Sequence, residues 1–326
     1  MPLLIEMEIN GTTNYLSQEG VALDHYWDSK IVNFDSPQKA LAQKWGGYLR
    51  PNFGSISYFP DLFINNWPPP TKCLTIAKYT DTTETSATTL FTAMGHLLTI
   101  NRNEVTYGLH GESYSATIAA NVNVTGSLAT NFITSAASLG LGFDRTLARN
   151  DTSTNIVLLK TSGEQLLIDF LSDIAAYHTH MYYIEDNTIY LVDMFQDNGT
   201  TTMTEFDYFP ISYEFNQPVS AVNGGATVYT GVTYPYGSEI SQTPYQVANS
   251  EVTTALKKIY EIVEKPFINL SIPLKEPLRI TPRMRINLTD SSQIVDTSAY
   301  LRVGTTIYDF NREEVTITGE GEIESA

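Results

Sequence analysis

The chain of 326 residues has a single cysteine, Cys73, and few charged residues, which make up 17% of it. One cysteine excludes an intramolecular disulfide and a zinc site built from several cysteines. No run of about 18 apolar residues occurs, so we expect no membrane-spanning helix. The N-terminal MPLLIEMEING lacks a basic region followed by an apolar run. We therefore expect no signal peptide and a product of a reducing cytoplasm.

Positive charge is scarce, because 19 Lys and Arg residues stand against 36 Asp and Glu residues, for a net charge of -17. A protein that grips nucleic acid by its phosphates needs the opposite balance, so we expect no tight nucleic-acid binding. An acidic surface can line a passage through which DNA slides without sticking. It can equally serve solubility alone, and the composition leaves both readings open.

Motifs of common enzymes are also missing, since there is no Gly-rich phosphate loop, no G-x-S-x-G and no H-E-x-x-H. Asp-Thr-Ser occurs at Asp151 and Asp296, and pepsin-like proteases carry such a motif on each of two catalytic carboxylates. The first copy follows RTLARN rather than an apolar strand. We interpret both copies as polar turns, in which Asp and Ser bond their own backbone.

His178 and His180 form a His-x-His pair, a spacing that on a strand puts both rings on one face and could bind zinc. No third ligand is indicated, and a histidine just past a helix end is favourable to the helix dipole. We interpret the pair as incidental to function. We therefore expect no catalytic, cofactor-binding or metal-binding residue, no cofactor, and a protein that is not an enzyme.

Strand patterns fill the first hundred residues and the last part of the chain. LLIEMEI, CLTIAKY and HLLTI read as strands near the N-terminus, as do PFINLSIPL, MRINLT and EVTITGEGEIE near the C-terminus. One helix is expected at about 251–264, ended by Pro266. Its apolar face consists of Val252, Leu256, Ile259 and Val263.

The middle of the chain predicts two further helices. Leu128, Phe132 and Ala136 have helical spacing, and Gly140 is suited to end that helix. The second helix is expected to start at a capping box formed by Ser162 and Gln165. Its apolar stripe consists of Leu166, Leu167, Phe170, Leu171 and Ile174.

This second helix should stop near 177–179 and lead into MYYIEDNTIYLVD, two short strands joined by a tight turn at Asp186 and Asn187. A helix that packs on a hairpin makes a compact unit with a small core of its own. We expect Phe170 and Ile174 to be buried against the hairpin.

The stretch GEQLLIDFLSDIAAYHTHMYYIEDNTIYLVD resembles a segment of the tail hub proteins of tailed bacteriophages, also called baseplate hub or late-control-type tail proteins. The order of elements continues with PISYEFNQPVSAVNGGATVYTG, VTTALKKIYEIVEKPFINLSIPL, PRMRINLTD and YLRVGTTIYDFNREEVTITGEGE. NRNEVTYGLHG precedes it. The similarity covers roughly residues 101–322.

The resemblance implies a mainly β fold of the α+β class with two tube-type β-barrel domains. They would span residues 1–105 and 201–326, with a smaller α/β domain, residues 106–200, inserted between them and carrying the helix-hairpin unit. Three copies would place six barrels in a ring.

The function implied is that of a structural virion protein, a trimeric tail or baseplate hub. It would join the hexameric tail tube to the threefold tip or spike and surround the DNA exit channel. Its partners would be two further copies of itself, the tail tube protein, the spike or tip protein and the tape measure protein. It would be assembled in the host cytoplasm and reside in the virion tail.

The alternative is a receptor- or glycan-binding β-rich tail protein. Aromatic, Asn-rich and Thr-rich stretches such as FINNWPPPTK suit that role.

Overall fold

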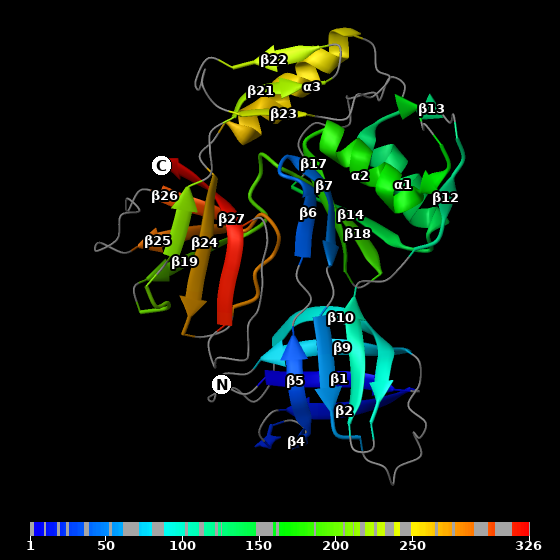
Figure 1. Ribbon diagram of the computed structural model, residues 1–326, viewed down its shortest axis with the longest axis vertical. Helices are drawn as coiled ribbons and strands as arrows, with labels where there is room; N and C mark the ends of the chain where they lie inside the picture. The colour runs from blue at the N-terminus through cyan, green and yellow to red at the C-terminus, as the bar shows by residue number, and fades with distance from the viewer. Residues whose placement is uncertain are drawn as a thin grey trace.

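The fold is given by a computed structural model (Figure 1). The structure describes residues 3–325 apart from scattered stretches of at most three residues and some longer segments. The longer segments are 61–71, 80–87, 148–158, 232–237, 242–248, 290–298 and 304–314. Strands dominate the described residues, and three helices occur among them. The expected mainly β fold is therefore confirmed.

The largest sheet forms the lower part of the molecule in Figure 1 and has nine strands in the order β3-β4-β2-β1-β9-β10-β11-β8-β5. Along β1, Ile5, Met7 and Ile9 are buried while Glu8 is exposed, the alternation of a strand with one face in a core. The bounds are β1 (Leu3–Ile9), β2 (Thr12–Ser17), β3 (Val21–Ala22), β4 (Tyr26–Ser29), β5 (Ile31–Asp35), β8 (Gly54–Tyr58), β9 (Lys72–Tyr79), β10 (Thr88–Ile100) and β11 (Val105–His110).

Between β5 and β8 the chain leaves this sheet and forms a hairpin that joins a second, five-stranded sheet. The order there is β14-β18-β17-β7-β6, so strands far apart in the sequence share one sheet. In Figure 1 the blue hairpin lies beside the green strands. The bounds are β6 (Lys39–Gln43), β7 (Gly46–Pro51), β14 (Gly142–Thr146), β17 (His180–Glu185) and β18 (Thr188–Asp193). We call this the central sheet.

The central sheet is covered on both faces. Tyr182 and Leu191 belong to a core shared with the helices α1 (Leu128–Ser138) and α2 (Leu167–Tyr177). The alternate residues Met181 and Val192 belong to a different core, shared with helix α3. Strands buried on both faces in this way have apolar residues at successive positions, as MYYI and IYLV do.

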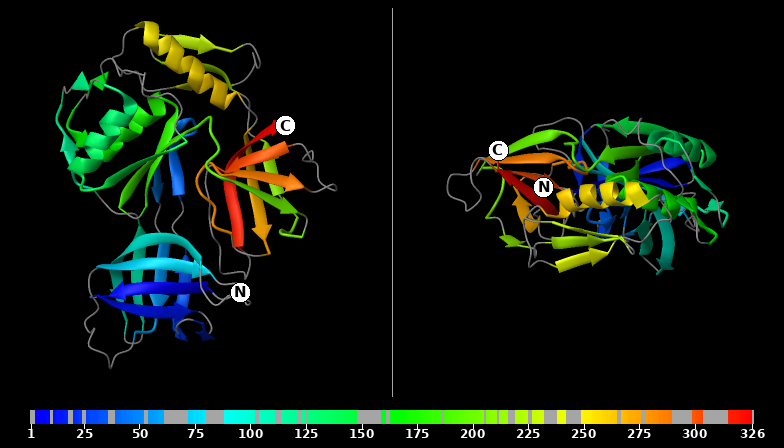
Figure 2. Two further views of the ribbon diagram at one scale, coloured as in Figure 1. Left: turned by 180° about the vertical axis from the view of Figure 1, so that it is seen from behind. Right: turned by 90° about the horizontal axis from the view of Figure 1, so that it is seen from above.

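Helix α3 (Asn249–Val263) packs with a three-stranded sheet in the order β22-β21-β23. Viewed from behind, this layer lies at the opposite end of the molecule from the nine-stranded sheet (Figure 2). Leu256, Ile259 and Val263 are buried, as the sequence predicted. The bounds are β21 (Val219–Asn223), β22 (Val228–Thr230) and β23 (Ser238–Ser241).

A six-stranded sheet completes the fold, in the order β19-β25-β26-β27-β24-β20. Met203, Ile272 and Ile286 lie in its core, which is continuous with the core of the nine-stranded sheet. The bounds are β19 (Thr200–Thr204), β20 (Ser212–Phe215), β24 (Phe267–Leu274), β25 (Arg285–Thr289), β26 (Ala299–Val303) and β27 (Val315–Ser325).

Neither large sheet closes into a barrel within the described residues. The nine-stranded sheet runs from β3 to β5 and the six-stranded sheet from β19 to β20, and among the residues described the two ends of each sheet do not pair. The domain ranges 1–105, 106–200 and 201–326 stay a prediction. Sheet membership crosses them, because β6 and β7 of the first range pair into the central sheet and α3 of the third covers it.

The capping box predicted at Ser162 and Gln165 is wrong. Helix α2 begins at Leu167, and its N-cap is Leu166, which makes no side-chain capping bond. Gln165 and Leu166 form the short strand β16 (Gln165–Leu166), which pairs with β12 (Thr117–Ile118). Strand pairing holds this backbone extended, so the helix starts later than the sequence pattern indicates. A similar short pair joins β13 (Asn123–Val124) to β15 (Leu159–Lys160).

Leu166, predicted on the apolar stripe of the second helix, precedes α2 and is 38% exposed, so that part of the stripe is wrong. Other predictions for the middle of the chain are confirmed. Leu128, Phe132 and Ala136 are buried, and Gly140 adopts a positive φ of 72° after the end of α1. β17 and β18 pair as a hairpin around Asn187, whose φ is 57°. No helix within the described part of the chain has the length and apolarity to cross a membrane.

Candidate functional site at the central junction

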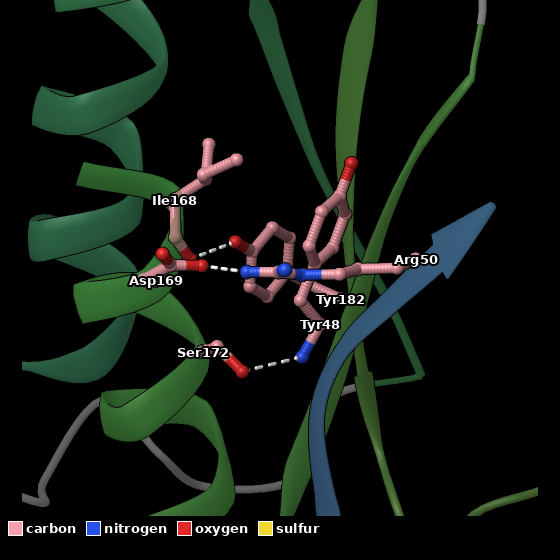
Figure 3. Close-up of polar contacts among 6 residues, drawn as sticks. All are labelled: Tyr48, Arg50, Ile168, Asp169, Ser172 and Tyr182. Carbon is pink, nitrogen blue, oxygen red and sulfur yellow. Dashed lines mark hydrogen bonds and ion pairs between the residues drawn. The ribbon is translucent and has the colours of Figure 1, made fainter. Parts of the chain in front are cut away.

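Strand β7 meets helix α2 and strand β17 at a cluster of six residues that we call the central junction (Figure 3). Tyr48 of β7 pairs with Tyr182 of β17 in parallel register, and their rings stack with centroids 4.7 Å apart. Phe132 of α1 approaches the Tyr182 ring edge-on at 5.2 Å. The junction consists of Tyr48, Arg50, Ile168, Asp169, Ser172 and Tyr182.

Two hydrogen bonds and an ion pair connect the same elements. The backbone N–H of Tyr48 donates to Ser172 Oγ at 2.9 Å, and the Tyr182 hydroxyl donates to the carbonyl oxygen of Ile168. Arg50 forms an ion pair with Asp169 at the exposed rim. Figure 3 shows three parallel links from α2 to the strands. A buried polar group costs stability unless it is bonded, so these links select one seating of β7 on α2.

The hydrogen bonds and the ion pair of the junction hold β7 and β17 against α2. Burial raises the pKa of Tyr182 well above its usual value, and the neighbouring Tyr48 adds to the effect. The phenol therefore stays neutral and keeps donating its hydrogen bond. A neutral phenol that donates its proton to a carbonyl oxygen is a weak nucleophile near neutral pH.

Gly46 places the tip of the β6–β7 hairpin under the end of α2. A Cβ atom at this position would lie 2.2 Å from the carbonyl oxygen of His180 and 3.2 Å from the Cα of Ala176. The residue also has a φ of 144°, which side chains rarely tolerate. Only glycine lets the hairpin approach this closely.

His178 and His180 are both buried, on either side of Thr179, where α2 ends and β17 begins. His180 Nδ1 lies 2.7 Å from the carbonyl oxygen of His178, which fits a hydrogen bond donated by the ring. Burial lowers the pKa of His178 to about 3, with His180 and Lys258 adding to the effect. No group of three or more His, Cys, Asp and Glu residues suited to a metal ion occurs in the described part of the chain.

The other residues singled out in the sequence have separate outcomes. Asp151 and Asp296 lie outside the described residues, so the interpretation of their motifs as turns stays a prediction. Cys73 lies in β9, in a different sheet. Phe170 and Ile174 are buried in one core with Tyr182, Ile189 and Leu191 of the hairpin, which confirms that prediction.

Sequence reasoning missed the two junction residues that β7 supplies, Tyr48 and Arg50. They lie more than a hundred residues from α2, in a stretch that appeared to belong to the first domain. Their only local signal is WGGY, whose paired glycines indicate a tight turn but not what the turn packs against.

No protein-family model matches the sequence, and no curated protein matches it. Solved structures do. A tail protein from Neisseria meningitidis MC58 is 9% identical and superposes with a TM-score of 0.61, over 98% of this chain and 96% of that one. The 43 kDa tail protein of prophage MuSo2 from Shewanella oneidensis is 6% identical with a TM-score of 0.57, over 98% and 97% of the two chains.

A third similar structure is prophage tail protein gp18 from Listeria monocytogenes EGD-e. It is 11% identical with a TM-score of 0.51, over 97% of this chain and 94% of that one. At such low identity the likeness establishes the fold. The chain therefore shares its fold with these three tail proteins, in agreement with its resemblance to tail hub proteins.

Proposed function

We propose that the chain is a structural virion protein that forms the trimeric hub of a phage tail or baseplate. The observation that carries this proposal is the extent of the structural likeness. The superposition on a tail protein covers 98% of this chain and is not limited to one of its sheets. In the proposed assembly the nine-stranded and six-stranded sheets are the walls of two tube-type barrels. Three copies then give a ring of six.

The two large sheets have the surfaces that such walls need. In β19, Met203 is buried while Thr200 and Thr202 are exposed, and in β1 the buried Met7 is followed by the exposed Glu8. In β19, and in β1 from Ile5 to Ile9, one face of the strand enters a core and the other is polar. The polar faces are free to line a channel or to meet tail proteins.

The net charge of -17 supports a channel through which DNA passes. A wall of like charge repels the phosphates and leaves a duplex mobile, whereas a basic wall would hold it through counterion release. In this proposal the hub lies in the virion tail and is assembled in the host cytoplasm. It contacts the tail tube, the spike or tip and the tape measure protein, and it catalyses no reaction.

Imaging and mass measurement of the purified protein test the proposal together. Native mass spectrometry should give a mass of three chains, and negative-stain images should show a ring with a lumen. A monomer at all accessible concentrations, or a trimeric fibre without a lumen, would contradict the hub. A fibre that is retained on host cell-wall glycans would instead support the receptor- or glycan-binding alternative.

A further inference from the structure

Two buried residues adopt a left-handed backbone that side chains rarely take. Thr179 has a φ of 55° and Arg283 a φ of 64°, and each is only 2% exposed. The other two non-glycine residues of this kind in the described chain, Leu147 and Asn187, are exposed. A β-branched residue in this region is unusual, and such strain persists only where the surroundings impose it.

The backbone of Met194 connects these two residues directly. Its N–H donates to the carbonyl oxygen of Thr179 at 3.0 Å, and its carbonyl oxygen accepts from Nη2 of Arg283. Met194 is itself buried. One residue thus forms hydrogen bonds to both strained positions, within a core where bonds are not readily exchanged for bonds to water.

Thr179 connects this contact to the central sheet. It lies between the end of α2 and the start of β17, and its own N–H donates to the carbonyl oxygen of Ala176 at 3.0 Å. The hairpin tip at Gly46 packs against the next residue, His180. A change of backbone at Thr179 would therefore move the end of α2 and the seat of the β6–β7 hairpin.

Arg283 connects this contact to the six-stranded sheet, because only Met284 separates it from the first residue of β25. The N–H of Asn198 donates to the carbonyl oxygen of Arg283 at 2.9 Å, and the Asn198 side chain donates to that of Pro282 at 3.0 Å. The N–H of Arg285, the first residue of β25, donates to Gly199 at 3.0 Å. This turn is where β25 attaches to the segment that leaves the central sheet.

We propose that Thr179, Met194 and Arg283 form a conformational joint. It couples the position of the six-stranded sheet to the backbone conformation at the end of α2. If either strained residue relaxes to an ordinary φ, the carbonyl or guanidinium it presents to Met194 turns away. The bond on the other side of Met194 then loses its support. Packed interiors change between discrete arrangements rather than deforming smoothly. In this proposal the joint therefore has two arrangements, one with both hydrogen bonds to Met194 and one without them. The proposal holds whether or not the chain is a tail hub.

Amide hydrogen exchange of the full chain tests the coupling. Arg283→Met removes the guanidinium donor while keeping an apolar body in the core. The amides on the far side of Met194, those of His178, Thr179 and Met194 itself, should then exchange at least about tenfold faster, as expected for a local opening. Arg283→Lys, which keeps the charge but not the planar fork, serves the same measurement if Arg283→Met does not fold.

The matched control lies on the same segment. Arg279 forms an ion pair with Glu185 at 3.1 Å and is partly exposed, so Arg279→Met should leave the three amides at their original rates. Acceleration confined to residues 281–285 in the Arg283 variants would overturn the proposal. So would uniform acceleration that includes the nine-stranded sheet, since that pattern is global destabilisation.

A reciprocal variant completes the test. Thr179→Gly removes the strain at the other end, because glycine adopts a positive φ at no steric cost. Coupling between two sites is mutual, so the exchange of the Met284 and Arg285 amides should slow by about threefold or more. Unchanged rates at these two amides would show that Met194 does not transmit the change.

Discussion

Helices α1 and α2 have the same length and lie in one core, but they are fixed in opposite ways. The Ser127 side chain caps α1 by accepting from the N–H of Thr130, and the chain turns at Gly140. Three residues of α1 are buried. In α2 the N-cap Leu166 offers no side-chain bond, yet eight residues are buried and the strands bond to it from the side.

The difference shows which forces act at each place. Local capping defines a helix whose outer face is free, whereas packing and cross-element bonds define a helix enclosed by other elements. Changes in the partners of α2 should therefore cost more than changes in its own ends. For α1 the local cap should matter.

The largest effect is expected from Gly46→Ala, which changes no residue of α2. The added Cβ would meet the His180 carbonyl oxygen at 2.2 Å, and the φ of 144° is unsuited to alanine. Overpacking and backbone strain together predict a loss of about 5 kcal/mol in the free energy of unfolding. Urea denaturation measures it. Gly163→Ala is the control, since a Cβ there meets nothing within 4 Å and should change little.

Phe170→Ala removes the largest apolar side chain that α2 puts into its core. Phe170 is buried with Ile174 and Tyr182, so the loss should be about 3–5 kcal/mol from lost burial and the cavity left behind. Phe206→Ala is the matched control, because Phe206 is 75% exposed and should cost about 0.5 kcal/mol or less. Equal losses for the two variants would refute the assigned packing.

The buried end of α2 should make stability depend on pH. The pKa of His178 is about 3 in the folded chain against an ordinary 6.5, so between pH 6.5 and about pH 3 only the unfolded chain binds this proton. The free energy of unfolding should fall as pH falls through this window, by up to about 1.4 kcal/mol per pH unit. This contribution is fully present above pH 6.5.

Carboxylates also titrate in acid, so the measurement is a difference between two proteins. Denaturant midpoints from pH 6 to pH 4 should fall more steeply in the wild type than in His178→Gln, which cannot take up the proton. Parallel curves would mean that the folded protein accommodates a charged His178.

The same contrast explains what the sequence could predict. The buried face of α1, the apolar face of α3 and the turn at Asn187 depend on residues close in sequence, and periodicity and turn chemistry identify them. The hairpin of β17 and β18 was predictable for that reason. Such features can be predicted without knowing which distant segments pack against them.

The start of α2 and the central junction could not be predicted in this way. Gln165 follows an acceptable capping pattern, but its backbone is paired with Ile118 in a distant strand. Tyr48 reaches Ser172 only because β6 and β7 leave the first sheet and join another. Such pairings depend on contacts between segments far apart in the sequence, and neither composition nor periodicity records them.

For α1 the local cap is the sensitive point. Ser127→Ala removes the oxygen that accepts from the Thr130 N–H at 3.1 Å, which should cost about 1 kcal/mol. Thermal unfolding should show the loss, and Ser127→Asp should retain most of the stability because its carboxylate can cap. If Ser127→Asp falls as far as Ser127→Ala, the cap bond is not what Ser127 contributes.

The smallest expected change is a gain, from supplying α2 with the cap it lacks. Leu166 has φ -62° and ψ 138°, the extended backbone of an N-cap, and is 38% exposed. In Leu166→Ser the hydroxyl could accept from the N–H of Ile168 or Asp169, while the N–H of Leu167 already donates to Ala116 at 2.8 Å. Lost apolar burial offsets this gain relative to the wild type, so the reference is Leu166→Ala, which loses the same burial without capping. We expect Leu166→Ser to be more stable than Leu166→Ala by about 0.5 kcal/mol. Denaturant midpoints of these two variants compare them directly. Equal midpoints would mean that the first turn of α2 is held entirely by its tertiary partners, which would strengthen the contrast with α1.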